Sequence, residues 1–251
     1  MRDVGHVVVL DNAEALAGRG ASEFAARAAR SVEARGRFSV ALSGGSTPRR
    51  LNRILTEDTY RLEVPWKRVH LFWGDERHVR PSDPQSNYRM VRETLLSRVD
   101  VPASNVHRIE AERDPDEAAM LYEEELRRSF ELVDAGPPRF DLVFLGMGAD
   151  GHTASLFPGT DVLEMRDRWV AAPWVPQLSA YRITMTVPVF EAAAAVLFLV
   201  SGAEKAQTLR AVLDPSTPPD AFPCLRVRPT QGELIWLVDR AAAGSLDRLG
   251  K

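Results

Sequence analysis

The residues best suited to chemistry lie in a glycine-rich loop near the middle of the chain. Residues 142–159 read LVFLGMGADGHTASLFPG, an apolar run that ends in three closely spaced glycines followed by His152. An apolar run ended by glycines is typical of a buried strand that feeds a turn. Glycine lets the backbone approach a ligand, and histidine exchanges protons near neutral pH. We therefore predict that this loop is the catalytic centre, with His152 as general base and Asp150 placed to orient its ring.

The same loop also matches a dinucleotide-binding pattern. Gly146 to Gly151 read G-x-G-x-x-G after an apolar run, and that motif should open a long helix leading to a second strand with an acidic end. Here Pro158-Gly159 closes the segment after only seven more residues. The sequence therefore disfavours a nicotinamide cofactor. A tight turn with a surface histidine is the other interpretation of the loop taken alone.

A second loop has the composition of an anion receptor. It reads Ser43-Gly44-Gly45-Ser46-Thr47 and lies between the apolar run 38–42 and Pro48. It offers successive N–H groups, hydroxyls and the N-terminus of a helix for which Thr47 is the expected N-cap. The loop lacks the Gly-Lys-Ser/Thr ending of a P-loop, which disfavours a nucleoside triphosphate. A plain capping turn is the alternative.

Three basic residues could complete such an anion site. Lys205 falls in the first turn of a predicted helix, where the macrodipole disfavours a cation unless an anion or the neighbouring Glu204 compensates. Arg77 and Arg182 lie near the ends of predicted strands and could bind a phosphate or carboxylate through two hydrogen bonds. Each arginine alone could equally be a surface or ion-pair residue. Together these residues predict an anionic substrate.

The elements that must position these loops alternate between strands and helices. Apolar runs predict strands at 7–10, 38–42, 69–73, 140–145, 182–187, 195–200 and 234–238. Periodicity and capping residues predict helices at 21–32 (ended by Gly36), from Thr47, from Asn87 to about 96, from Asp114 to about 130, at 203–213 and at 240–249, with an irregular proline-rich stretch at 215–223. This alternation predicts an α/β fold with a mostly parallel sheet covered by helices on both faces.

The fold class also predicts where the site lies. In open parallel sheets, ligands bind beyond the carboxyl ends of the strands. The polar loops after Leu42, Trp73, Leu145 and Val200 should therefore open on one edge. The second of these loops contains Asp75 and Arg77.

Composition excludes several classes of protein. The 251 residues, 45% hydrophobic and 27% charged, fit a single domain over residues 1–251, and the net charge of −3 gives no basic field for nucleic acid. No apolar stretch is long enough to span a membrane, and the N-terminus has no signal-peptide pattern. Cys224, the single cysteine, should be a buried thiol in a reducing cytoplasm.

Motifs for metal-dependent or serine-dependent hydrolysis are missing from the sequence. His6, His70, His78 and His107 have no metal-ligand spacing. The chain also lacks G-x-S-x-G, which disfavours a serine nucleophile. His152 is the histidine that remains for acid–base chemistry, with Asp150 and Asp75 as nearby carboxylates.

With these residues identified, the chain resembles the 6-phosphogluconolactonase family. The matching segments are LSGGSTP from Leu42, WGDER from Trp73, SNY from Ser86, GMGADGHTASLFPG from Gly146, RITMT from Arg182 and GAEKA from Gly202. The resemblance implies a Rossmann-like fold shared with glucosamine-6-phosphate deaminase. It also implies hydrolysis of 6-phospho-D-glucono-1,5-lactone to 6-phosphogluconate, the second step of the oxidative pentose phosphate pathway, without metal or other cofactor.

The resemblance also separates related functions. Deaminase relatives carry a glutamate where Phe157 stands and use it in sugar ring opening, so Phe157 favours a lactonase over a sugar-phosphate isomerase or deaminase. A non-catalytic sugar-phosphate sensor is a third hypothesis. The expected partner is a small sugar phosphate rather than nucleic acid or a membrane, and the sequence leaves monomer and homodimer open. Asp75 could be catalytic, bind a sugar hydroxyl or pair with Arg77.

Overall fold

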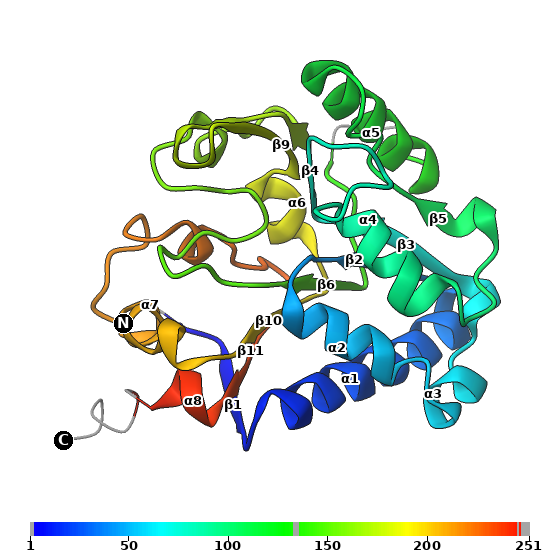
Figure 1. The fold of residues 1–251 in the computed structure, drawn as a ribbon, viewed down its shortest axis with the longest axis horizontal. Helices are drawn as coiled ribbons and strands as arrows, with labels where there is room; N and C mark the ends of the chain where they lie inside the picture. Colours follow the sequence, from blue (N-terminus) through cyan, green and yellow to red (C-terminus); the bar gives the residue numbers. More distant parts are fainter. Residues whose placement is uncertain (1–2, 133–135, 245, 247–251) are drawn as a thin grey trace.

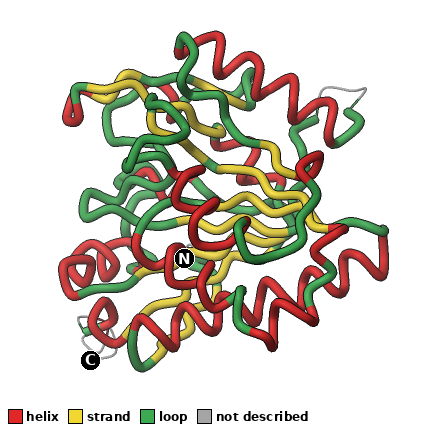
Figure 2. The backbone as a smooth tube through the Cα atoms, turned by 45° about the vertical axis from the view of Figure 1, so that its right-hand side comes forward, coloured by secondary structure: helices red, strands yellow, loops and turns green. Residues whose placement is uncertain are grey.

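The larger of two β-sheets forms the centre of the structure. The computed structural model describes residues 3–132, 136–244 and 246 (Figure 1). Within these residues, seven parallel strands lie in the order β1-β11-β10-β6-β2-β3-β5. They are β1 (His6–Leu10), β2 (Phe38–Leu42), β3 (Val69–Trp73), β5 (Val106–His107), β6 (Leu142–Leu145), β10 (Ala195–Val200) and β11 (Glu233–Asp239). Figure 2 shows this sheet as a twisted layer with helices on either side, which confirms the predicted α/β fold.

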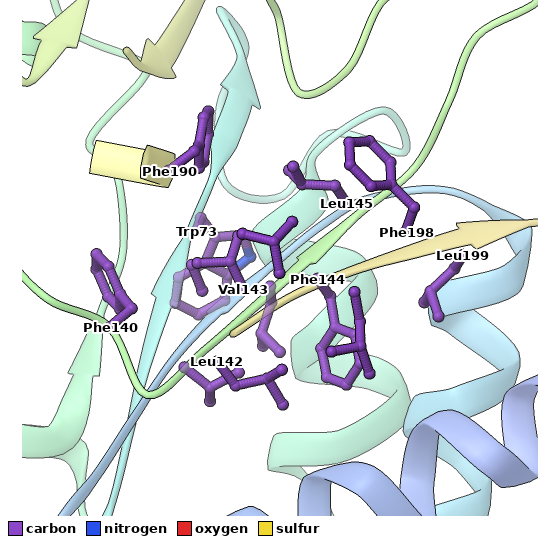
Figure 3. Close-up of a cluster of buried hydrophobic side chains, with 14 of the residues drawn as sticks. Trp73, Phe140, Leu142, Val143, Phe144, Leu145, Phe190, Phe198 and Leu199 are labelled. Carbon is purple, nitrogen blue, oxygen red and sulfur yellow. The ribbon is translucent and has the colours of Figure 1, made fainter. Parts of the chain in front are cut away.

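The side chains of β6 are covered on both faces of the sheet, which accounts for the mostly apolar sequences of the central strands. Figure 3 shows Leu142 and Phe144 pointing to one side of β6, and Val143 and Leu145 to the other. All four side chains are buried. Phe190 of α6 (Val187–Ala192) lies on the side of Val143 and Leu145 (Figure 3). A strand covered on both faces cannot alternate between apolar and polar residues.

Two helices cover the other face. α1 (Ala13–Arg35) contacts β2, β10 and β11 and packs against α2 (Ser46–Ile54). The Asn12 side chain caps α1 by accepting from the N–H groups of Glu14 and Ala15, and Gly36 ends it with φ 75°, as predicted. A Cβ on Gly20 of α1 would lie 2.5 Å from Leu51 Cδ1 of α2, so a glycine allows the two helices to approach closely.

The second sheet is antiparallel and differs from the prediction. It has the order β4-β9-β7, with β8 paired to β9. Its strands are β4 (Asp75–Arg77), β7 (Val170–Ala171), β8 (Trp174–Val175) and β9 (Ala180–Met185). The polar loop expected after Trp73 is therefore a strand in part, and the strand expected at 182–187 lies outside the parallel sheet. Gly74 joins the sheets, because its N–H donates to Leu42 O at 2.9 Å and its O accepts from the N–H of Met185 at 2.9 Å.

Several predicted boundaries are wrong. α1 begins at Ala13 rather than at residue 21, because Asn12 caps it there. Gly45, not Thr47, is the N-cap of α2, because its φ of 107° favours glycine and starts the helix earlier. Ser86, not Asn87, caps α4 (Asn87–Val91), since its Oγ accepts from the N–H of Arg89. β6 begins at Leu142 rather than at residue 140, because the preceding Asp141 carboxylate binds Ser39 instead.

Three other helices follow the predicted pattern more closely, namely α5 (Pro115–Ser129), α7 (Ala206–Leu213) and α8 (Arg240–Ala243). The sequence analysis missed α3 (Asp58–Glu63). Asp114 caps α5 as predicted, and the proline-rich stretch contains turns and bends up to residue 222, before a 3-10 helix over Pro223–Arg226. The predicted continuation of α8 to residue 249 lies outside the described residues. Cys224 is buried, and no helix in the described parts has the length and apolar content to cross a membrane.

A histidine pair holds the edge strand β5 against β3 and α5. His70 Nδ1 lies 3.2 Å from His107 Nε2, and His107 Nδ1 lies 2.6 Å from Glu125 Oε1. Burial, followed by the charges of Arg37 and His107, lowers the pKa of His70 to about 4. The folded protein therefore favours the neutral ring.

We expect acid to weaken this fold through His70. In the unfolded chain the ring binds a proton near its ordinary pKa of 6.5, whereas the folded chain resists protonation until about pH 4. The contribution of His70 to the free energy of unfolding is therefore unaffected above pH 6.5, and it falls as the pH drops toward 4, where the unfolded chain binds a proton that the folded chain does not. Urea unfolding across this range should show a steeper loss of unfolding free energy for the wild type than for His70→Gln. The exposed control His6→Gln should follow the wild type; identical slopes for the wild type and His70→Gln would contradict this account.

Candidate active site

The loops that follow β2, β3, β6 and β10 meet at the carboxyl edge of the parallel sheet. They surround a cavity of about 320 Å³, to which they contribute Ser43, Asp75, Gly146 and Ser201 respectively. The whole Ser43–Thr47 loop lines this cavity, together with His152, Arg77 and Lys205. The rule for ligand binding in parallel sheets therefore located this meeting point from sequence.

A larger cavity elsewhere is less suited to a ligand. It measures about 880 Å³, and ion pairs among the described residues neutralise three of the four arginines that line it, Arg92 being the exception. Arg108 pairs with Glu112, Arg113 with Glu110 and Glu117, and Arg128 with Glu125. Charged groups that are already paired with one another offer little to a ligand, so size alone does not identify the site.

The histidine of the glycine-rich loop is held by Asp150. His152 Nδ1 lies 2.6 Å from Asp150 Oδ1, and the same oxygen accepts from the His152 backbone N–H at 3.1 Å. Partial burial alone would raise the pKa of Asp150, but the hydrogen bonds from His152 lower it below its ordinary value. An ionised Asp150 can only accept a hydrogen bond, so it favours the tautomer in which Nδ1 carries the proton and donates, and it leaves Nε2 of the neutral ring free to accept a proton.

Glycine is needed where the backbone of the loop passes close beside the imidazole of His152. Gly148 N–H donates to His152 O at 2.8 Å, and Gly151 N–H donates to Gly148 O at 3.1 Å. A Cβ on Gly148 would lie 2.1 Å from His152 Nδ1, which excludes any side chain there. The Cys224 N–H donates to Gly151 O at 3.0 Å, so the chain that leaves the proline-rich stretch supports the loop from the other side.

Asp75 is a buried carboxylate at the base of the cavity. It is 7% exposed, and its Oδ2 accepts from Ser155 Oγ at 2.7 Å. Its Oδ1 has a long contact of 3.5 Å with Asn87 Nδ2. The ion pair with Arg77 that the sequence left open is not found among the described residues, where Arg77 Nη1 instead donates to Gln85 O.

Within the described residues, no close ion pair neutralises the predicted phosphate ligands, although the charges of Asp75 and Glu76 act on Arg182 at longer range. Arg77 and Arg182 are partners in the β4–β9 ladder. Burial and then the charge of Arg77 lower the pKa of Arg182. Across the described ranges, neither arginine nor Lys205 has a carboxylate oxygen within 4 Å, and the buried Ser43 Oγ has no hydrogen-bond partner. These features suit a bound anion. Arg182 and Asp150 are not among the residues that line the cavity, so the sequence prediction that places Arg182 there is not supported by the lining.

Two residues that the sequence analysis did not name as site residues, Glu76 and Asn87, hold the segment that contains Asp75 and Arg77 in place. Glu76 is 2% exposed and accepts hydrogen bonds from Ser86 Oγ and from the N–H groups of Arg77, Asn87 and Tyr88. Burial raises the pKa of Glu76 although these N–H groups oppose the shift. Asn87 Nδ2 donates to Asp75 O at 3.0 Å, and a Cβ on Gly44 would lie 1.9 Å from Asn87 Oδ1. The only sequence signal was the position of both residues inside otherwise polar motifs.

Comparisons with known proteins agree with this geometry. A family model described as glucosamine-6-phosphate isomerases/6-phosphogluconolactonase matches residues 11–236. The chain is 41% identical over 241 residues to a 6-phosphogluconolactonase of Nostoc sp., covering 96% of this chain and 98% of that protein. It is 37% identical over 203 residues to one from Haemophilus influenzae, covering 81% and 85%.

Solved structures give the same result. A 6-phosphogluconolactonase from Trypanosoma cruzi superposes with a TM-score of 0.86 at 28% identity, covering 96% of this chain and 97% of that one. A monomeric glucosamine-6-phosphate deaminase shares the fold with a TM-score of 0.80 at 20% identity, covering 96% and 99%. From its sequence and its architecture, this chain belongs to the glucosamine-6-phosphate isomerase/6-phosphogluconolactonase family.

Proposed function

We propose that the chain hydrolyses 6-phospho-D-glucono-1,5-lactone to 6-phosphogluconate, in the oxidative pentose phosphate pathway. The observation that carries this proposal is the meeting of a base and an anion receptor in one cavity. His152, oriented by Asp150, lines the same cavity of about 320 Å³ as the Ser43–Thr47 loop and Lys205. The names of the relatives add support, because those at about 40% identity are called 6-phosphogluconolactonases.

The reaction follows from the tautomer of His152. Nε2 takes a proton from a water molecule as its oxygen attacks the lactone carbonyl carbon, C1. Backbone N–H groups of the glycine-rich loop are the candidates to stabilise the resulting oxyanion. When the C1–ring oxygen bond breaks, the protonated imidazole returns its proton to the departing oxygen, which becomes a hydroxyl. The new carboxylic acid then ionises, so each turnover releases one proton.

The rest of the cavity positions the substrate. The 6-phosphate would be held by Ser43–Thr47, Arg77 and Lys205, which line the cavity and combine donors with positive charge. Arg182 is the ladder partner of Arg77 and would add positive charge beside it, from outside the lining. Asp75, fixed by Ser155 and without a cationic partner among the described side chains, is placed to accept from a sugar hydroxyl. It is also the second candidate for the base.

An isomerase or deaminase activity is less favoured. The side chain against His152 is the phenyl ring of Phe157, with ring centroids 4.2 Å apart. A second acid at this place would be expected for sugar ring opening, as in the deaminase relatives. Phe157 therefore supports the lactonase.

We further propose that the protein acts as one domain in the cytoplasm, as a monomer or homodimer. The single cysteine supports a reducing compartment, and the net charge of −3 gives no support for a nucleic-acid partner. Both sheets contribute to one hydrophobic core, which supports a single domain.

Proton release provides the direct test of the proposed activity. Freshly generated 6-phosphogluconolactone should acidify a weakly buffered solution faster with the protein than without it, after correction for spontaneous hydrolysis. Heat-inactivated protein serves as the control. A rate that does not depend on protein concentration would refute the proposal.

A further inference from the structure

We infer that Phe157 is a positioning residue that fixes the plane of the His152 imidazole. The two rings are stacked, with centroids 4.2 Å apart and planes 23° from parallel. Phe157 is 6% exposed, so its ring fills the space beneath the imidazole rather than facing solvent. The inference rests on the proposed function only in treating His152 as the base.

The backbone between the two residues is shaped to bring them together. Leu156 N–H donates to Thr153 O at 2.9 Å, which closes a tight turn. Ala154 lies in this turn with φ 47°, a conformation that L-residues seldom adopt, so the surrounding structure must enforce it. After the turn, Phe157 O accepts from Thr160 Oγ1 at 2.7 Å, which holds the residue that carries the phenyl ring.

The stack with Phe157 restricts tilting of the imidazole, which the hydrogen bond to Asp150 alone cannot prevent. A hydrogen bond at Nδ1 fixes one atom of the imidazole and tolerates tilting of the ring about that atom. Gly148 closes off the space beside Nδ1 and Cε1, where an added Cβ would come within 2.1 and 2.3 Å. Phe157 covers one face. With these contacts the ring has one orientation, and Nε2 keeps the direction in which it must meet water.

Kinetics can separate positioning from substrate binding. Phe157→Leu removes the flat ring but keeps an apolar side chain, and kcat for the phosphorylated lactone should fall roughly tenfold because the base loses its alignment. KM should stay within about twofold, since Phe157 is outside the predicted phosphate ligands. Phe157→Tyr restores a ring and should recover kcat to within about twofold of the wild type.

A matched control removes an aromatic ring from the other side of the same loop. Phe222 packs on Gly151, where an added Cβ would lie 2.6 Å from Phe222 Cδ1. Phe222→Leu should keep kcat within about twofold. Melting temperatures of all variants show whether each is folded, and Phe157→Met replaces the leucine variant if that one is not.

A spectroscopic readout tests the stack without substrate. Relaxation of the Cε1–H group of His152 should report a rigid imidazole in the wild type and in Phe157→Tyr, and a more mobile one in Phe157→Leu, while Asp150 keeps the tautomer the same in all three. Unchanged mobility and kcat in Phe157→Leu, or an equal loss of kcat in Phe222→Leu, would overturn the inference. Failure of the wild type to hydrolyse the lactone would instead refute the proposed function, and the relaxation data would still decide the role of Phe157.

Discussion

Replacement of His152 by glutamine should lower kcat by roughly 10²–10⁴, the usual range for the loss of a general base. Glutamine keeps polarity and approximate size but cannot take a proton from water at neutral pH. KM should change little, because the imidazole is assigned to the chemical step and Lys205 and the Ser43–Thr47 loop to the phosphate. Steady-state kinetics by proton release, corrected for spontaneous hydrolysis, measures both constants.

The control for this experiment is His78→Gln. His78 is exposed, contacts Tyr181 and lies outside the residues that line the candidate cavity, so its loss should leave kcat nearly unchanged. Near-wild-type turnover in His152→Gln would assign the base elsewhere. Asp75 is the next candidate, because it is a buried carboxylate in the same cavity.

Removal of the phosphate from the substrate should be nearly as damaging. Unphosphorylated glucono-1,5-lactone keeps the reacting ester but loses the phosphate, which the basic residues of the site and the Ser43–Thr47 loop are proposed to bind. Charge-assisted hydrogen bonds contribute about 1.5–3 kcal/mol each, and two or three would be lost together. Binding energy at a remote group also positions the reacting centre, so kcat should fall as well as affinity. We expect kcat/KM to be at least roughly 10³-fold lower for the plain lactone.

The variant Lys205→Ala, tested with both lactones, distinguishes phosphate binding from other effects of removing the phosphate. Lys205→Ala should lower kcat/KM for the phosphorylated lactone by roughly 10- to 100-fold, the equivalent of one charge-assisted contact. The rate with the plain lactone, which never used that contact, should stay within about twofold. Lys67→Ala is the matched control, since Lys67 is exposed and pairs with Asp100 away from the cavity. Equal damage to both substrates from Lys205→Ala would show that this residue does not bind the phosphate.

The sequence was most informative where strands are buried on both faces. The bounds of β2, β3 and β10 agree with the predicted runs residue for residue, because a strand covered on both faces is mostly apolar, with Ser39 and His70 as the polar exceptions. The position of the candidate site followed from the same elements, since parallel strands bring their carboxyl ends together. His152 and the Ser43–Thr47 loop could thus be placed on one edge without a structure.

The second sheet could not be predicted in the same way. β4 has three charged residues, and local patterns assign such a segment to a loop. It is a strand because Asp75 and Glu76 find their donors elsewhere, from Ser155 in a distant loop and from the start of α4. These hydrogen bonds join segments that are far apart in the chain, so they cannot be predicted from the local sequence around β4.

The order of the parallel sheet has a consequence for synthesis on the ribosome. β11 lies between β1 and β10, and the Trp236 indole donates to Val4 O at 2.9 Å, so β1 pairs with a strand that is made much later (Figure 1). At about 5–20 residues per second, β1 is exposed for more than ten seconds before its partner emerges. During that interval the nascent chain carries unpaired edges on β1 and β10, which are prone to pair with other chains. The sheet therefore cannot be completed until residues 233–239 have been made, and chaperones that shield the earlier strands should raise the yield of folded protein.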